Sequence, residues 1–192
     1  MNFTRIGDSA TAVARSLRGP ERHTSGNAPY DRAMREPVFA DTVQVALVVA
    51  DLQAAMEVYV ERYGIGPWEI YEFNPDTVEN MKAHGEPIAA SWRLALARVG
   101  GVVWELIEPL DSRSTYAEFL SEHGPGVHHV GMAGTAFPDT LVELAAEGRT
   151  PLLSGRYRGI DFAYLPTQAD LGVVTEIFSA VPSGQEPDAH YP

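Results

Sequence analysis

Apolar, β-branched runs separated by turn residues recur between residues 42 and 180, and they predict a protein built mainly from strands. The first run, TVQVALVV at 42–49, is apolar enough to be a buried strand. Asp51 predicts the N-cap of a following helix that Gly64 ends, because Asp accepts backbone N–H groups and Gly adopts the left-handed conformation. The apolar positions of this helix fall on one face: Leu52, Ala55, Met56, Tyr59 and Val60.

Three further strands are predicted in the first half of the chain. Residues 67–73, PWEIYEF, alternate like a strand, and a polar loop is expected from there to about residue 88. Residues 90–110 predict a hairpin whose two apolar arms flank a Val-Gly-Gly turn at 99–101. The first half therefore predicts the order β-α-β-β-β.

The same order is predicted again after a connector. Ser114 and Thr115 can cap a short connector helix, and Gly124 and Pro125 can end it. Beyond it come a strand in VHHVGMAG, a helix in PDTLVELAAEG and three strands in TPLLSGRY, GIDFAYLPT and LGVVTEIFSA. Two copies of one unit are expected to pack about a pseudo-twofold axis, so this repeat constrains the fold more than any single motif.

The pattern predicts an α+β fold in which two β-α-β-β-β modules form one cupped mixed sheet. The segments outside the modules are rich in Gly, Pro and polar residues, and they are expected to be an arm and a loose tail. The predicted parts are an N-terminal arm at 1–40, a first module at 41–110, a connector at 111–125, a second module at 126–180 and a C-terminal tail at 181–192.

Composition limits the partners and the kind of site. The 14 Lys and Arg residues against 26 Asp and Glu residues give a net charge of −12, which disfavours nucleic acid and anionic membranes as partners. The absence of cysteine excludes disulfides, thiolate catalysis and Cys-based metal sites, so any metal must be held by oxygen and imidazole ligands. There is no apolar run of the length of a membrane span and no signal-type apolar core, so a cytoplasmic protein is expected.

Two predicted strands carry an acid in their middle. GVVWELIEP at 101–109 and GVVTEIFSA at 172–180 place Glu105 and Glu176 at matching positions of the repeat. Alternate side chains of a strand point to opposite faces, so both acids would point into one cavity if each module forms half of a cup. Buried, unpaired carboxylates are costly and would repel each other, and a divalent metal ion between them would relieve both penalties.

The first strands of the two modules complete the candidate site. Aligning Gln44-Val45-Ala46 with His129-Val130-Gly131 gives Gln44 and His129 equivalent positions. Three oxygen donors and one nitrogen donor suit Zn, Mn, Fe(II), Co or Ni. The metal-free alternatives are salt bridges from the acids to Arg93 or Arg156, a hydrogen-bonded core histidine, and an amide bonded to a neighbour. The predicted metal ligands are Gln44, Glu105, His129 and Glu176.

These features resemble the vicinal oxygen chelate superfamily, which includes glyoxalase I, methylmalonyl-CoA epimerase, extradiol dioxygenases and bleomycin- or fosfomycin-resistance proteins. The resemblance rests on the paired modules and on VALVVADLQAAMEVYVERYG, VVWELIEPL, GPGVHHVGM and GVVTEIFSA, and it covers about residues 42–180. Members carry metal ligands on the first and fourth strands of each unit, and here these positions hold the four residues above. The Gln-Glu-His-Glu set resembles that of a zinc glyoxalase I, so zinc is the expected metal.

The chain departs from each of these relatives in a different way. Val48 stands where glyoxalase I has an Arg for glutathione. The wording GPGVHHVGM and ELIEPL is closer to the epimerases, but their Glu-Gln-Gly before the third strand is absent, and Glu86 is the local carboxylate that could replace its Glu. Extradiol dioxygenases use two His and one Glu, and Gln44 occupies the position of the first His.

The resemblance implies a metal-dependent lyase or isomerase that acts on a carbonyl or thioester compound through an enolate-like intermediate. Glu176 is expected to act as the base, with Glu105 as its counterpart across the pseudo-twofold axis. The alternatives are an Fe(II) ring-cleaving dioxygenase and a metal-free protein that binds or sequesters a small molecule. Members are commonly dimeric, so a homodimer is expected.

Aromatic and basic residues on the predicted strands could contact a small-molecule substrate in the cup. Arg93, Arg156 and Arg158 could meet an anionic group. The expected substrate-binding residues are Trp92, Tyr71, Phe162 and Tyr164.

Overall fold

The computed structural model describes residues 38–133, 136–182 and 184–192, which belong to the second of the two units into which the chain divides, 37–192. All but the last three residues of the predicted arm lie outside the described residues. The first half contains β1 (Asp41–Val48), α2 (Leu52–Tyr63), β2 (Trp68–Phe73), β3 (Val78–Ala83), β4 (Glu86–Pro87), β5 (Trp92–Val99) and β6 (Val102–Pro109). The remainder contains α3 (Thr115–His123), β7 (Gly126–Ala133), α4 (Phe137–Ala146), β8 (Leu153–Tyr157), β9 (Ile160–Leu165), α5 (Gln168–Leu171), β10 (Val174–Phe178) and β11 (Ala189–Tyr191).

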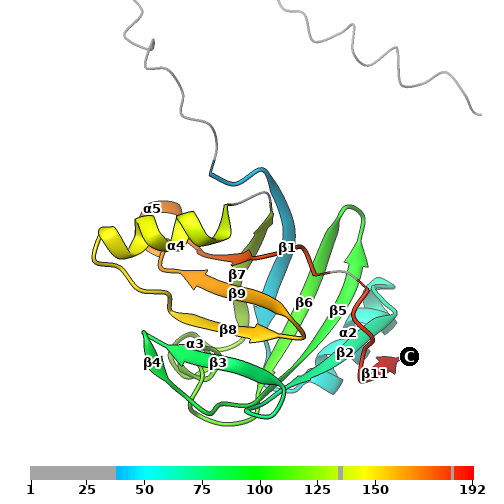
Figure 1. The fold of residues 1–192 in the computed structure, drawn as a ribbon. Helices are drawn as coiled ribbons and strands as arrows, with labels where there is room; N and C mark the ends of the chain where they lie inside the picture. Colours follow the sequence, from blue (N-terminus) through cyan, green and yellow to red (C-terminus); the bar gives the residue numbers. More distant parts are fainter. Residues whose placement is uncertain (1–37, 134–135, 183) are drawn as a thin grey trace, which may run out of the picture. The chain divides into compact units, whose positions relative to one another are not determined.

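One curved mixed sheet contains the strands of the described residues, in the order β11-β2-β5-β6-β1-β7-β10-β9-β8-β3-β4 (Figure 1). The groups β2-β5-β6-β1 and β7-β10-β9-β8 are mirror images in this order, and each is built from a β-α-β-β-β unit. The halves meet at β1 and β7, which are antiparallel, while β1 runs parallel to β6 and β7 parallel to β10. The predicted α+β fold with a cupped mixed sheet is confirmed.

The strand register repeats between the halves as a pseudo-twofold axis requires. In each half, the third residue of a short segment of the first strand pairs with the glutamate of the fourth strand: Ala46 of β1 pairs with Glu105, and Gly131 of β7 pairs with Glu176. The register pairs are Gln44–Gly131 and Ala46–His129 between β1 and β7, Ala46–Glu105 between β1 and β6, and Gly131–Glu176 between β7 and β10.

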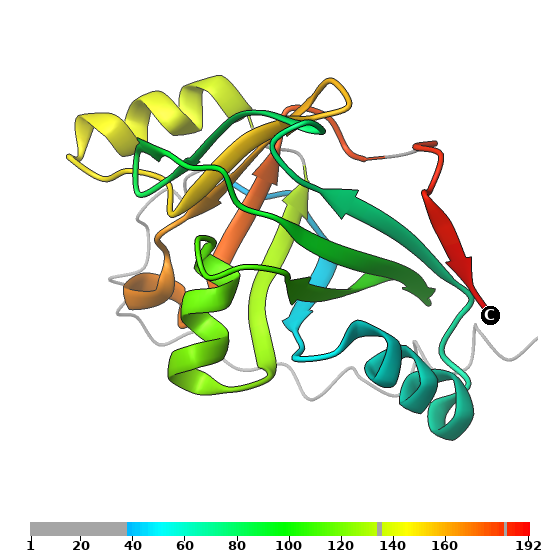
Figure 2. The ribbon, with the colours of Figure 1, turned by 90° about the horizontal axis from the view of Figure 1, so that it is seen from below.

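Helices cover the outer face of each half, as Figures 1 and 2 show for α2 and α4. The Asp51 carboxylate accepts the backbone N–H of Ala54 at 2.9 Å, and Gly64 ends α2 with φ of 65°, so both predicted ends are confirmed. Leu52 and Met56 of α2 are buried against β2, β5 and β6. Apolar residues of α4 pack in the same way on β9 and β10, with Leu144 the most buried.

The polar segment after β2 is not the predicted loop. It forms β3 and β4, and β3 leaves its own half to pair with β8 of the other half. Its buried residues, Val78, Met81 and Ala83, do not alternate, because the register shifts between Glu79 and Lys82. A strand whose apolar positions fall out of the two-residue period gives no alternation signal in the sequence.

The C-terminal segment is not a loose tail. Its last residues form β11, which pairs with the edge of β2. Arg158, in the turn between β8 and β9, holds this segment by donating to the Glu186 carbonyl and to Asp188 Oδ1, the latter at 2.9 Å. Asp188 Oδ2 also accepts the backbone N–H of Glu72 at 2.9 Å. Residues 184–191, called the C-terminal strap below, therefore join the two halves.

Candidate functional site

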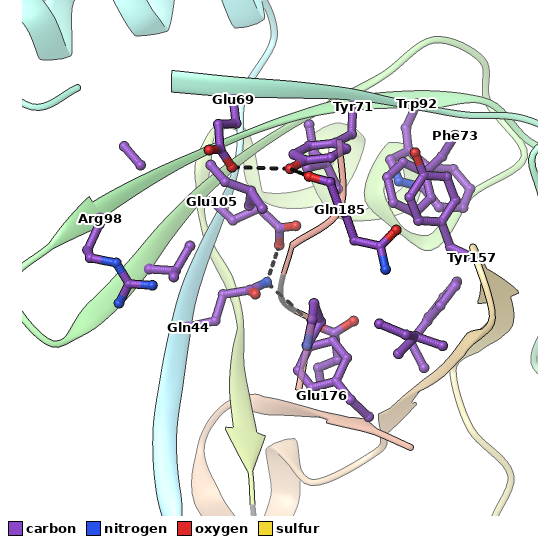
Figure 3. Close-up of a pocket in the computed structure, with 18 of the residues that line it drawn as sticks. Gln44, Glu69, Tyr71, Phe73, Trp92, Arg98, Glu105, Tyr157, Glu176 and Gln185 are labelled. Carbon is purple, nitrogen blue, oxygen red and sulfur yellow. Dashed lines mark hydrogen bonds between the residues drawn. The ribbon is translucent and has the colours of Figure 1, made fainter. Parts of the chain in front are cut away.

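The four predicted metal ligands converge inside the cup. They project from β1, β6, β7 and β10, which are adjacent in the middle of the sheet, and all four are buried. Glu105 Oε2 lies 2.6 Å from Gln44 Nε2 and 3.3 Å from His129 Nε2, while Glu176 Oε2 lies 3.4 Å and 3.0 Å from the same two atoms. The cluster closes within one chain, and Figure 3 shows Gln44 between the two carboxylates.

The cluster fits a metal ion. One ligand atom each from Glu105, His129 and Glu176 lies within 4.8 Å of the others. Ligands held about 2.0–2.2 Å from one zinc ion are roughly 3–3.5 Å apart, which matches the imidazole–carboxylate distances. His129 Nε2 is fully buried without a hydrogen-bond partner, although it lies between two carboxylates. An orphaned imidazole nitrogen facing two acids is the donor arrangement of a metal site.

Gln44 occupies the fourth position of the cluster. Its amide nitrogen donates to Glu105 at 2.6 Å and reaches Glu176 at 3.4 Å. An amide binds a metal ion through its oxygen, so Gln44 would have to turn its Oε1 to this position. Gly131 leaves room for this side chain, because a Cβ at Gly131 would lie 2.8 Å from Gln44 Cβ.

His128 holds His129 from the side opposite the carboxylates. The two Nδ1 atoms are 3.0 Å apart, and burial, with a smaller contribution from His129, lowers the pKa of His128 to about 3. The β1–β7 register skips His128, a β-bulge that lets consecutive histidines both be buried. His128 packs against Tyr116 and Phe119 of α3.

Charges in the cluster compensate one another. Burial lowers the pKa of His129, but the two carboxylates, Glu176 first, outweigh it and raise this pKa to about 9. Burial raises the pKa of Glu176, and the nearby charge of Glu105 adds to the rise, while His129 opposes it. The metal-free site therefore holds a proton on His129 at neutral pH, and a cation of some kind is required between the acids.

The cluster lies in a cavity of about 630 Å³, within the range of small-molecule sites. The four predicted substrate-binding residues, Tyr71, Trp92, Phe162 and Tyr164, all line it. Phe73, Arg98, Tyr116 and Gln185 also line the cavity, and no pattern in the sequence marks them as site residues.

Tyr116 and Tyr164 form a hydroxyl pair beside the acids. Their Oη atoms are 2.6 Å apart, and burial raises the pKa of both phenols well above 10, with the negative charges of Glu176 and Glu105 contributing. Both hydroxyls therefore keep their protons, of which one forms the hydrogen bond between them and the other can be donated to a further acceptor. Tyr116 belongs to the connector helix, and only its place on the apolar face of that helix could have indicated a role in the cup.

An aromatic wall, defined here as Phe73, Trp92 and Tyr157, lines one side of the cavity. Phe73 stacks between the other two, with ring centroids 5.2 Å from Trp92 and 3.9 Å from Tyr157. The C-terminal strap lines another side, where the Gln185 carbonyl accepts the Tyr71 hydroxyl at 3.1 Å (Figure 3).

The metal-free alternatives that rested on arginine pairing are wrong. Arg93 pairs with Glu108 at 2.5 Å and Arg156 with Asp161 at 2.7 Å, so neither reaches the buried acids. Both side chains, and Arg158, are outside the cavity lining, where Arg98 is the arginine present. Glu86 is exposed on β4 and does not line the cavity, so it does not stand in for the missing Glu.

Comparisons with known proteins agree with this fold. Methylmalonyl-CoA epimerase from Mycobacterium tuberculosis is 22% identical with a TM-score of 0.56, over 79% of this chain and 95% of that chain. Streptomyces coelicolor methylmalonyl-CoA epimerase in complex with 2-nitronate-propionyl-CoA is also 22% identical with a TM-score of 0.56, over 76% of this chain and 99% of that chain. A hypothetical protein from Bacillus halodurans is 18% identical with a TM-score of 0.55, over 76% and 98% of the two chains.

These identities establish a shared fold, and the search of curated proteins found no match. No helix of the described residues is long and apolar enough to cross a membrane. Residues 43–164, well over half of the chain, match the family described as the Glyoxalase/Bleomycin resistance protein/Dioxygenase superfamily, which confirms the resemblance seen in the sequence. The chain belongs to this superfamily.

Proposed function

We propose that Gln44, Glu105, His129 and Glu176 hold one divalent metal ion, with zinc as the expected metal. We further propose that the protein is a lyase or isomerase that acts on a carbonyl or thioester compound. The observation that carries the proposal is the fully buried Nε2 of His129, which lies 3.0 and 3.3 Å from two carboxylate oxygens without a well-directed hydrogen bond to either. The epimerase fold of the similar structures supports the same class of chemistry.

A bound divalent ion would supply charge stabilisation for a substrate oxygen that becomes negative when an adjacent C–H loses its proton. Glu176 is suited to take that proton, because burial moves the pKa of its carboxyl upward, towards the range of a general base. The hydroxyls of Tyr116 and Tyr164 can donate a hydrogen bond at the same end of the cavity.

The pseudo-twofold axis favours an isomerase within this class. Inversion at a carbon requires a proton to leave one face and a proton to arrive at the other. Glu105 and Glu176 come from equivalent strands of opposite halves, and both line the cavity. They are therefore suited to serve the two faces of one substrate carbon.

Elemental analysis of the purified protein, followed by exchange of substrate C–H for deuterium from D₂O, tests the proposal. We expect one divalent ion per chain and exchange with a subset of 2-oxo compounds or acyl-CoA thioesters. A chain that binds no divalent ion would instead be a small-molecule binder. Consumption of oxygen with catechols after Fe(II) loading would instead support ring cleavage.

A further inference from the structure

The cavity is chemically different at its two ends. Strand β5 runs along the cavity from one end to the other, so its residue spacing gives the distance between them. Its alternate residues Trp92, Leu94, Leu96 and Arg98 all line the cavity, because alternate side chains of a strand share a face. Leu96 lies beside Glu105 in the strand register. The row therefore passes the acid cluster at Leu96, with Trp92 towards one end and Arg98 at the other.

The Trp92 end is apolar and aromatic. The aromatic wall stands there, and Leu94 and Phe162 line the cavity with it. Flat, polarizable surfaces of this kind favour an aryl ring or another bulky apolar group over a methyl group. Figure 3 shows the aromatic wall on one side of Glu105 and Glu176 and Arg98 on the other.

The Arg98 end carries one cationic side chain. Among the described residues, five arginines form ion pairs with Asp or Glu, whereas Arg98 and Arg62 form none, and of these two only Arg98 lines the cavity. Glu69 also lines the cavity, and its Oε2 accepts the Tyr71 hydroxyl at 3.1 Å. A guanidinium without a carboxylate partner at a cavity wall is suited to bind an acid group of a ligand.

Strand geometry gives the spacing. At about 3.3–3.4 Å per residue, Arg98 is roughly 7 Å beyond Leu96, and Trp92 is roughly 13 Å away in the opposite direction. We propose that the substrate is an elongated oxo acid, with its carbonyl at the acid cluster, a carboxylate at Arg98 and an aryl or bulky apolar arm at the aromatic wall. This inference rests on the proposed function, and a carboxylate is assigned because it matches the single charge of Arg98.

Three ligands that differ by one feature at a time test the substrate class. 4-Oxo-10-phenyldecanoate carries the carboxylate, the carbonyl and, at the end of a six-carbon arm that spans the distance to the aromatic wall, the ring. 10-Phenyldecan-4-one has a methyl group in place of the carboxylate, and 4-oxoundecanoate has a methyl group in place of the ring. Calorimetric titration of the full chain, with and without zinc, is expected to show about tenfold tighter binding of the first ligand than of either other.

Variants assign each preference to its end of the cavity. Arg98→Gln should weaken 4-oxo-10-phenyldecanoate about tenfold and leave 10-phenyldecan-4-one unchanged, whereas Arg98→Lys should restore part of the loss. Phe73→Ala should weaken both phenyl ligands and leave 4-oxoundecanoate unchanged. Arg62→Gln, on α2 outside the cavity lining, is the matched control and should change none of the affinities.

Equal affinities for the three ligands, no binding of any of them, or an equal loss of all ligands in Arg98→Gln would overturn the inference. The metal-free titrations separate its failure from that of the proposed function. A metal-free, exchange-inactive chain that keeps this ligand order would refute the enzyme and retain the ligand class. A chain that binds zinc and catalyses exchange but does not show this order of ligand affinities would support the enzyme and refute the ligand class.

Discussion

Glu105 and Glu176 are buried carboxylates in otherwise apolar strands, and their environment explains how the chain tolerates them. Gln44 and His129 each reach both acids, and the pKa of His129 is raised to about 9 chiefly by the negative charges of the acids, which outweigh the effect of its burial. A proton or a metal ion can therefore occupy the same electrostatic position. Metal binding must displace that proton, so affinity for the ion is expected to fall as the pH is lowered.

Glu176→Gln is expected to impair both catalysis and metal binding, whereas the same substitution at a surface acid should impair neither. The amide cannot take a proton and is a weaker ligand, so deuterium exchange should fall by about 10² to 10⁴ and metal affinity by at least about tenfold. Glu72→Gln, an exposed acid whose side chain is outside the cavity, is the control and should change neither. Full exchange activity in Glu176→Gln would exclude this carboxylate as the base.

The central β1–β7 pair sets the geometry of the site among the secondary structure elements. Gly131 lies beside Gln44 in the register, and its lack of a side chain lets the amide occupy the space over it. Gly131 is part of the GPGVHHVGM motif on which the family resemblance rests. The sequence does not indicate, however, that the side chain of Gln44 needs the space beside this glycine.

Gly131→Ala should therefore disturb the site through Gln44. An added Cβ would approach Gln44 Cβ to 2.8 Å, so either the side chain or the strand pair must move. We expect a loss of stability of about 1–3 kcal/mol and weaker metal binding, measured by chemical denaturation and metal titration. Gly126→Ala, on the same strand, meets Phe119 at an ordinary 3.9 Å and should be close to neutral. Equal effects of the two substitutions would contradict this explanation.

The elements with regular periodicity could be predicted from the sequence, and the irregular ones could not. The hairpin of β5 and β6 turns where the Val-Gly-Gly sequence predicts, and α3 is capped by Ser114 and ended by Gly124 as expected. β3 was missed because its bulge breaks the alternation, and β11 because three residues at a sheet edge carry too little pattern.

Three connections hold the halves together across the whole molecule. The first is the β1–β7 pair at the centre of the sheet, the second is β3 crossing to β8, and the third is the C-terminal strap. The strap depends on Arg158, which lies over the rings of Tyr157 and Tyr71 at 4.9 and 5.8 Å. The turn between β8 and β9 therefore fixes the strap against the first half, while dimerisation stays a prediction.

The stability of the whole molecule should fall in alkali. Burial raises the pKa of Tyr59, Tyr116, Tyr157 and Tyr164, and it raises that of Tyr71 to about 12. These phenols hold their protons more tightly in the folded state than in the unfolded state, where they ionise near pH 10. Their contribution is fully present below about pH 10 and is lost as the pH rises towards 12.

Urea denaturation across this alkaline range, with phenolate absorbance recorded on the same samples, measures the effect. The free energy of unfolding should decrease with rising pH while the buried phenols ionise late and together with unfolding. Early ionisation of every tyrosine in the folded chain would contradict the burial described here.

By itself, the sequence determined the repeat, the alternation within regular strands, the helix ends and the four residue types of the cluster, because each of these is written in local periodicity or in matching positions of the two modules. Only the tertiary structure decided that both modules of one chain close the cup, that Arg93 and Arg156 pair elsewhere, and that Arg98, Tyr116 and the strap line the cavity. The physical reason is that contacts between elements distant in the chain depend on sheet order and curvature, which no local pattern of apolar and polar residues records.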